Sequence, residues 1–276
     1  MESKSELRCK RIWVQDVRVS AELLETRLNA LRGERGTHSS PAQDALDAGV
    51  VLRLEAARNA ALRRDPVPSR VGNWWRGTLI EAAYQNLHAA ESLIALLYTV
   101  DEVEAEIPEA AARVEAGLAR DDPRRIAALE LLDGKRGEPG RRERLSKAIE
   151  VGFGSSDADH ARLRSFRNTV LIAAAVLTVL LVIFTLYVLS NPNDVPFCFT
   201  PAGGHTVCPS GDSTPSRHDV VAVAILGVLG GMLSGIVSIK NMQGTSVPYD
   251  VPGALALLKL PLGALSAVAA LIAIRG

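Results

Sequence analysis

Long and largely uncharged apolar stretches occur only in the C-terminal part of the chain, at residues 169–190, 220–239 and 251–274. Each is long enough to cross a hydrocarbon core of ~30 Å as a helix that rises ~1.5 Å per residue. The first two contain no charged residue, and a buried helix of a soluble protein is rarely apolar on every face. The pattern therefore predicts three membrane-spanning helices.

The third stretch is unusual because Lys259 and Pro261 lie inside it. A proline removes a backbone donor and crowds the preceding turn, so we expect a kink there. A charge in mid-bilayer costs about 3 kcal/mol on insertion scales, and none of the three stretches contains an Asp or Glu to neutralise it. By depth, the nearest polar side chain on the second stretch is that of Ser234.

Two main interpretations of Lys259 stay open. Its amine either snorkels or donates to Ser234 and to carbonyls, which fixes helix packing, or it rings a hydrated path in an oligomer, which would favour anions. A site for a partner or ligand is a further alternative. The sequence also leaves open whether residues 251–274 span the membrane or re-enter it.

Three glycines, Gly227, Gly231 and Gly235, are spaced four apart on the second stretch and share one helix face. Small residues let two membrane helices approach closely and gain packing energy. The glycine face therefore predicts a helix contact, either with another span of the same chain or with a second copy. We expect a homo-oligomer in the lipid bilayer.

Basic residues near the first span predict its orientation. Arg162, Arg164 and Arg167 precede the span, whereas the loop 191–218 carries only Arg217 as a strong base. Because basic residues favour the cytoplasmic side, we expect a cytosolic N-terminus and an extracytoplasmic loop. The first residues contain no apolar segment of the kind that a secretory signal needs.

The extracytoplasmic loop holds Cys198 and Cys208, two of the chain's three cysteines. Oxidation is permitted on that side of the membrane, so we expect a disulfide between them. A metal site that adds His205 is the alternative. It offers three ligands and lacks the spacing of common zinc sites, so we expect no metal.

Residues 1–155 predict a cytosolic helical bundle, and residues 156–276 a membrane region. Apolar residues recur in the first part with helical spacing, at Val17, Ala21, Leu24, Leu28 and Leu31, and again at Leu79, Ala83, Leu87, Ala90, Ile94 and Leu97. Aromatic residues are only 4% of the chain, which favours helices over sheets. The predicted fold class is all-α.

Local signals predict where several helices begin and end. Ser40 and Gln43 form the pattern of a capping box, and Asn73 is expected to cap a helix that starts at Trp74. Shorter helices are expected near 108–119, 122–133 and 139–150. The glycine-containing segment 152–159, GFGSSDAD, is expected to interrupt the helical structure. A new helix is expected to follow it and to enter the first span.

Charge and motifs argue against several functions. Lys and Arg total 31, as do Asp and Glu, so the chain has no bulk attraction for nucleic acid. The basic clusters 63–70 and 135–144 are interleaved with acids and lack flanking aromatics that could stack on bases. We therefore expect no nucleic-acid partner, while contact with anionic lipid or with another chain stays open for both clusters.

Evidence for an enzyme is weak. The chain contains no Walker loop, GxGxxG, GxSxG or HExxH pattern. Glu81, Gln85, His88 and Glu91 lie within three turns of one predicted helix, and such residues can bind a metal or transfer protons. A polar stripe that faces solvent or a neighbouring helix is the plainer interpretation, so we expect no cofactor.

Two adjacent tryptophans, Trp74 and Trp75, open the same predicted helix. Tryptophan is common both at membrane interfaces and in the cores of small bundles. Both interpretations stay open.

The C-terminal segment resembles a family of uncharacterised bacterial integral membrane proteins, many from actinobacteria, that carry the motif PYxVPxALALLKLPxGAL. The matching residues here are Pro248, Tyr249, Val251, Pro252, the run ALALLKLP at 254–261, Gly263, Ala264 and Leu265. The resemblance implies a multi-pass protein of the bacterial cytoplasmic membrane and brings no activity with it.

These observations predict a non-enzymatic integral membrane protein. Its cytosolic bundle would sense a signal or dock a cytosolic protein, and would be coupled to an oligomerising membrane region with the capacity to act as a channel or pore. The alternatives are a membrane-anchored scaffold without permeation and, less favoured, a membrane-bound enzyme.

Overall fold

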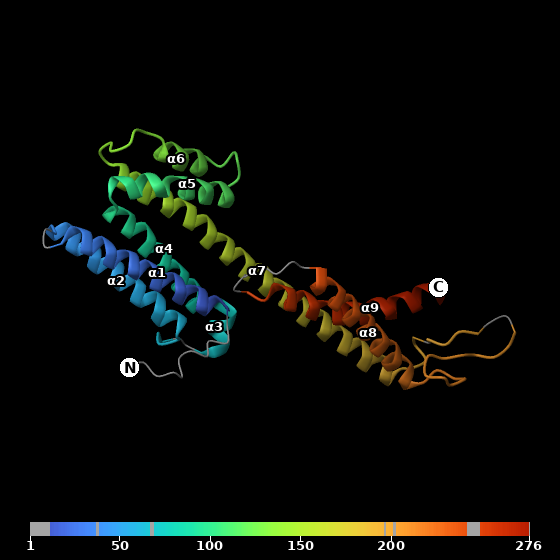
Figure 1. Cartoon of the computed structure of the whole chain (residues 1–276). Coiled ribbons are helices and arrows are strands. Elements are labelled where there is room, and N and C mark those ends of the chain that lie inside the picture. Colours follow the sequence, from blue (N-terminus) through green and yellow to red (C-terminus); the bar gives the residue numbers. More distant parts are fainter. Residues whose placement is uncertain are drawn as a thin grey trace. The chain divides into compact units, whose positions relative to one another are not determined.

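A computed structural model describes residues 12–36, 39–66, 69–195, 197–200, 203–241 and 249–275 of the chain. The described residues form helices joined by turns and loops, with one isolated β-bridge between Phe199 and Val207, so the predicted all-α class is confirmed. They divide into two compact units (Figure 1): the first contains the described residues up to Arg162, and the second contains those from Leu163 onward. The division falls slightly after the expected boundary at residue 155.

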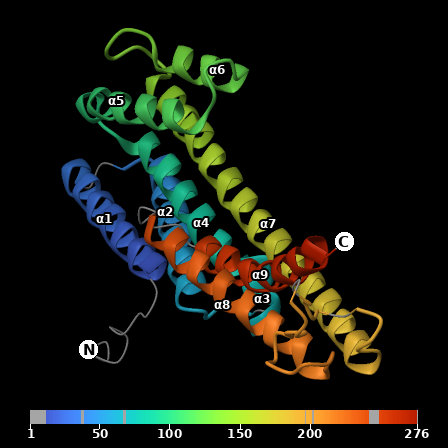
Figure 2. The same ribbon diagram turned by 90° about the vertical axis from the view of Figure 1, so that its right-hand side faces the viewer.

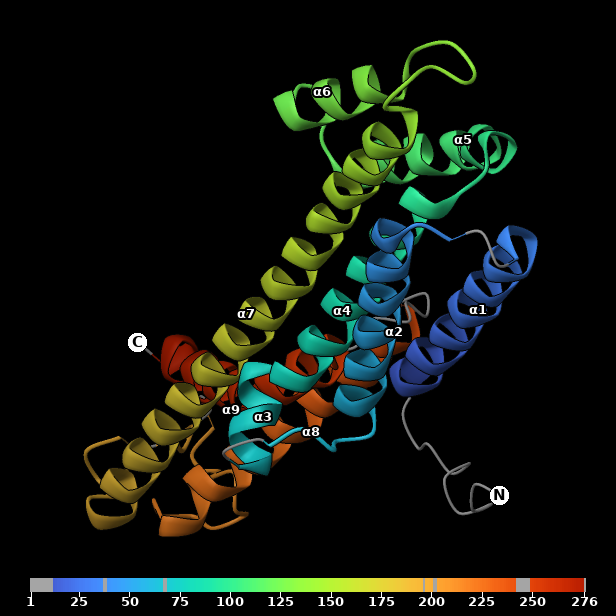
Figure 3. The ribbon, with the colours of Figure 1, turned by 90° about the vertical axis from the view of Figure 1, so that its left-hand side faces the viewer.

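The first unit is built around α1, α2 and α4, which pack against one another (Figure 3). Its helices are α1 (Ile12–Arg35), α2 (Pro41–Ala61), α3 (Arg70–Arg76), α4 (Thr78–Ile94), the short 3-10 helix η2 (Ala95–Leu97), α5 (Val100–Gly117), α6 (Pro123–Leu132) and the first part of α7 (Arg141–Ser190).

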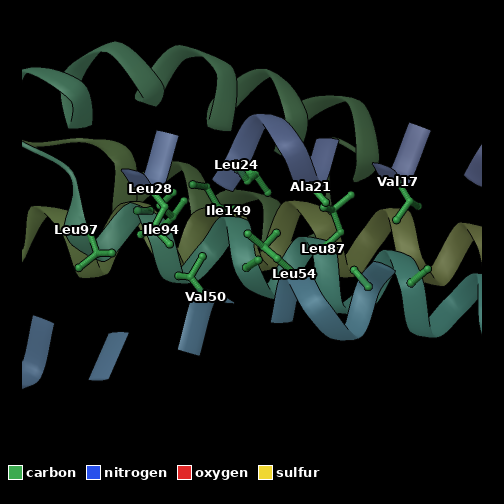
Figure 4. Packing of buried hydrophobic residues seen from close by; sticks show 14 of the residues in the cluster. Val17, Ala21, Leu24, Leu28, Val50, Leu54, Leu87, Ile94, Leu97 and Ile149 are labelled. Atoms are coloured by element: carbon green, nitrogen blue, oxygen red, sulfur yellow. The ribbon is translucent and has the colours of Figure 1, made fainter. Parts of the chain in front are cut away.

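The core of this unit forms where the apolar faces of α1, α2, α4 and α7 meet (Figure 4). Every apolar position predicted from the spacing in α1, α4 and η2 is buried. Leu54 of α2 and Ile149 of α7 belong to the same cluster, each 1% exposed. Burying a side chain of this size stabilises a fold by about 1.5–3 kcal/mol.

Capping residues set the starts of two helices. The predicted box at Ser40 is present, because its hydroxyl accepts from Gln43 N and the Gln43 side chain accepts from Ser40 N. A second box joins Thr99 and Glu102. It starts α5 at Val100, earlier than the expected start near residue 108, and the helix continues through Pro108.

The expected helix from Trp74 is wrong, because the chain turns at Gly77. Gly77 has a φ of +67°, a left-handed conformation that glycine adopts without steric cost. It ends α3 and separates it from α4. Asn73 does not cap a helix at Trp74: it lies inside α3, and its Oδ1 accepts from Leu79 N at 3.1 Å.

The expected break at residues 152–159 is also wrong, because α7 runs through this segment without interruption. Gly152 lies against α5: a Cβ there would contact Arg113 Cγ at 3.4 Å. Gly117 of α5 lies closer still to α7, since a Cβ on it would lie 2.1 Å from Ser155 Oγ. The small residues therefore serve close helix packing, which offsets the cost of about 1 kcal/mol for a glycine within a helix.

The second unit contains the end of α7, α8 (Arg217–Asn241) and α9 (Val251–Arg275). All three helices are long and apolar enough to cross a membrane, which is compatible with an integral membrane protein. Helices α8 and α9 pack along each other (Figure 2). Helix α9 continues through Pro261, and its 25 residues span roughly 37 Å at helical rise.

Candidate functional site

The closest helix contact in the second unit lies between the glycine face of α8 and the middle of α9. A Cβ on Gly231 would lie 2.1 Å from Lys259 O, and one on Gly227 would lie 2.6 Å from Gly263 O. A Cβ on Gly263 would lie 2.3 Å from Gly227 O, so the approach is reciprocal. The sequence left open whether the glycine face contacts another span of the same chain or a second copy. In the structure it contacts α9 of the same chain.

Gly235, the third glycine of the face, has more room. A Cβ there would lie 3.6 Å from the Cβ of Ala256, an ordinary contact distance. The two helices therefore approach most closely around Gly227 and Gly231, at the depth of Lys259.

This approach brings Lys259 to Ser234. The Lys259 amine donates to Ser234 O at 3.0 Å and to Ser234 Oγ at 3.3 Å. The lysine side chain is half-buried and Ser234 is exposed, so the amine lies at the edge of the α8–α9 pair. Pro261 is buried one half-turn further along α9. The site thus offers one cation, one hydroxyl and a carbonyl, with no carboxylate from any span.

A second polar contact in this unit joins Arg167 and Tyr249. In the sequence, Arg167 only indicated the orientation of the first span, and Tyr249 was only one residue of the C-terminal motif. Arg167 is 3% exposed, and its guanidinium lies 5.3 Å from the centroid of the Tyr249 ring. Its Nη2 also donates to Asn168 Oδ1 at 2.8 Å. The cation–π contact connects α7 to the residues immediately before α9.

The loop after α7 is closed by a disulfide between Cys198 and Cys208, whose Cα atoms are 4.1 Å apart. Asp219, 1% exposed, lies beside it and accepts from Ser210 Oγ at 2.7 Å and from Ser216 N at 2.7 Å. His205, the third ligand of the alternative metal site, is exposed on the loop.

Asp219 replaces His205 as the neighbour of the two cysteines. The ligand atoms of Cys198, Cys208 and Asp219 all lie within 4.8 Å of one another. However, sulfur atoms that are bonded to each other are not thiolates and are poor metal ligands. The arrangement favours a structural role for the loop.

We predict that mutation of Cys198 and Cys208 to serine loosens this loop. A disulfide that closes about ten residues contributes up to ~3 kcal/mol in the chain-entropy model. The double variant should therefore be cleaved faster by protease in the loop, while the helical content stays unchanged. Two alkylatable thiols in the oxidised, purified wild type at these positions would contradict the bond.

In the first unit, the polar stripe of α4 faces neighbouring helices. His88 Nδ1 lies 2.9 Å from Asp157 Oδ1 of α7, and Glu91 accepts from Arg113 Nη1 of α5 at 2.8 Å. Phe153 of α7 stacks on the His88 ring with centroids 3.9 Å apart, and the Arg113 guanidinium lies 4.2 Å from the Phe153 centroid. The sequence could not pair these residues, which come from three helices.

Burial perturbs the titration of this cluster. It raises the pKa of Glu91, against the opposing effect of the Arg113 guanidinium. Burial raises the pKa of Tyr84 to about 12. It also lowers the pKa of His160, whose ring contacts Tyr84 edge-on with centroids 5.2 Å apart. These groups are packed and paired, which fits helix docking better than acid–base catalysis on a substrate.

We predict that acid weakens this cluster through His160. Its pKa is lowered in the fold by burial, so the unfolded chain binds the proton more readily. Stability should therefore be complete above the ordinary histidine pKa of about 6.5 and fall as the pH drops through that value. Unfolding of the full chain between about pH 5 and 8 measures this.

Two histidine variants test the role of His160. His160→Gln should flatten the fall of stability at low pH, although the charged groups around it, Asp157, His88, Glu81 and Asp159, remain. His205→Gln, in the exposed loop, should leave the decline unchanged. Equal profiles for the wild type and His160→Gln would show that another group is responsible.

A cavity of about 230 Å³ lies elsewhere in this unit, lined among others by Val103, Glu104, Pro139 and Arg141. Arg141 is occupied there: its Nη1 donates to Leu132 O at 2.7 Å and its Nε to Glu104 at 3.1 Å. The cavity therefore holds no nucleophile or unpaired acid from these residues.

Comparison with known proteins does not assign the chain. No family model, no curated protein and no solved structure matches it.

Proposed function

We propose that this chain is a non-enzymatic membrane protein that passes a signal from a cytosolic helical bundle to its membrane-spanning helices. One observation carries the proposal: α7 is a single helix from Arg141 to Ser190. Its first turns place Leu145, Ala148 and Ile149 in the core of the bundle, and its last turns are the first apolar span. A continuous helix transmits displacement more stiffly than a loop does.

The contacts of α4 and α5 with α7 supply the input of this device. His88–Asp157 and Arg113–Phe153 hold α7 shortly before it leaves the first unit at Arg162. A ligand or cytosolic protein that shifts α4 or α5 would therefore act directly on α7. In this proposal the first unit is cytosolic, in keeping with the arginines before the first span and with a bacterial cytoplasmic membrane.

The proposal is tested by uncoupling the two units. A flexible Gly-Ser insertion after Arg162 keeps both units and the anchor but interrupts the helix. In host cells that lack the gene, this variant should fail to restore the wild-type phenotype although it is made and inserted normally. An insertion of the same length into the 191–218 loop is the control and should restore it.

Exchange of the spans separates this proposal from the scaffold alternative. A chain whose residues 169–276 are replaced by an unrelated anchor should be inactive if the spans receive a signal. Restored phenotype with the unrelated anchor would mean that the bundle acts as a docking module alone.

A further inference from the structure

Helix α3 carries large apolar side chains that do not serve the core of the bundle. Its seven residues are RVGNWWR, and none of them is buried. Val71 is 75% exposed and Trp74 is 47% exposed. A short helix with this composition and no buried residue contributes little to folding, so its apolar side chains point to another contact.

The position of α3 on the bundle is nevertheless well defined. Gly77 N donates to Asn73 O at 2.7 Å and closes the end of the helix. Leu79 N donates to Asn73 Oδ1 at 3.1 Å, and the Leu79 side chain is 2% exposed in the core. The bundle therefore presents Val71 and Trp74 outward on a fixed support.

Positive charge flanks these apolar side chains along the chain. Between residues 63 and 76 the chain has four arginines against one aspartate, a net charge of +3. All four arginines, Arg63, Arg64, Arg70 and Arg76, are exposed. An exposed tryptophan with basic neighbours matches the interface of an anionic bilayer, where the indole lies at headgroup level and arginine pairs with phosphate.

We propose that α3 docks on the anionic lipid surface of the membrane in which the chain is inserted. Trp74 and Val71 enter the headgroup region, and exposed arginines of this segment, Arg63 and Arg70 among them, bind lipid phosphates. This lipid contact does not depend on signal transfer through α7. It requires only that the chain is anchored in the membrane. For Trp74 it favours the membrane interface over the core of the bundle, the two interpretations that the sequence leaves open.

Intrinsic fluorescence tests the proposal cleanly. The three tryptophans of the chain are Trp13, Trp74 and Trp75, and none lies in a span. The full chain is reconstituted in phosphatidylcholine vesicles with or without phosphatidylglycerol, and lipid brominated on the acyl chain is the quencher. A variant that keeps only Trp74 should lose most of its emission in the anionic vesicles and much less in the neutral ones.

Two controls complete the experiment. A variant that keeps only Trp13, which is 6% exposed in the core, should not be quenched. Replacing the four arginines by glutamine, or adding salt, should relieve the quenching of Trp74. If Trp13→Phe does not fold, the difference between the wild type and Trp74→Phe gives the same quantity. Equal quenching of the Trp74-only and Trp13-only variants, with or without phosphatidylglycerol, would overturn the proposal and leave α3 as a protein-binding surface.

Discussion

Gly231→Ala should destabilise the α8–α9 pair by roughly 1–3 kcal/mol, the usual cost of overpacking a close contact. The new Cβ would lie 2.1 Å from Lys259 O and 2.9 Å from Lys259 C, both of them backbone atoms. A backbone cannot rotate away as a side chain can, so the helices must separate. Reversible unfolding of the full chain in detergent micelles measures the loss.

The same helix offers matched controls. Gly230 is adjacent, and a Cβ there meets nothing within 4 Å. Gly230→Ala should therefore be neutral or stabilising by up to about 1 kcal/mol through helix propensity. Gly235→Ala, with its nearest contact at 3.6 Å, should lie close to neutral. Equal stability of the Gly231 and Gly230 variants would contradict the close approach.

This series also tests where the glycine face acts. If it packs against α9 of the same chain, the loss caused by Gly231→Ala is independent of the ratio of protein to detergent. A loss that appears only at high protein concentration would instead place the glycines between copies and support the expected homo-oligomer.

Lys259→Met should have the opposite effect to Gly231→Ala and raise the free energy of unfolding by about 1–2 kcal/mol. Insertion scales charge ~2.5–3.5 kcal/mol for a lysine at the centre of a span. The two hydrogen bonds to Ser234 recover only part of this, since an interhelical hydrogen bond in a membrane protein averages about 0.6 kcal/mol. Unfolding by urea into water, in which the span leaves the micelle, measures the difference, with Ser234→Ala as the control for the hydroxyl contact.

The outcome decides between the two interpretations of Lys259. A stabilised Lys259→Met variant would mean that the lysine is kept for a role other than packing. Ion flux into vesicles that contain the wild type or the variant then tests the permeation version, in which flux depends on Lys259. Destabilisation by Lys259→Met would instead mean that the contacts of the amine outweigh its insertion cost, and would make the lysine a structural tie.

Much of the architecture was predictable because it depends on periodicity and local capping. The three spans follow from apolar runs that contain at most one charged residue, and the core positions of α1 and α4 follow from helical spacing. The box at Ser40 and Gln43 needs only neighbouring residues. These features involve interactions within one or two turns, so the order of the residues contains them.

Two of the boundaries that failed involve glycine. At Gly77 the left-handed conformation ended a helix, whereas Gly152 stayed within one because α5 packs against it. A glycine permits both results, and its local sequence does not choose between them. The choice depends on the tertiary surroundings of each glycine, which the local sequence does not contain.

By itself, the sequence determined that this chain is helical, which residues of α1 and α4 lie in its core and which stretches can cross a membrane. Only the tertiary structure decided the partners: Asp157 for His88 at a separation of 69 residues, Tyr249 for Arg167, and α9 for the glycine face. For Lys259, depth already suggested Ser234, and the packing of α8 on α9 brought the two within hydrogen-bonding distance. The reason is physical. The position of a residue in the helical repeat fixes which face of the helix it occupies, but which other helix meets this face depends on how the whole chain packs.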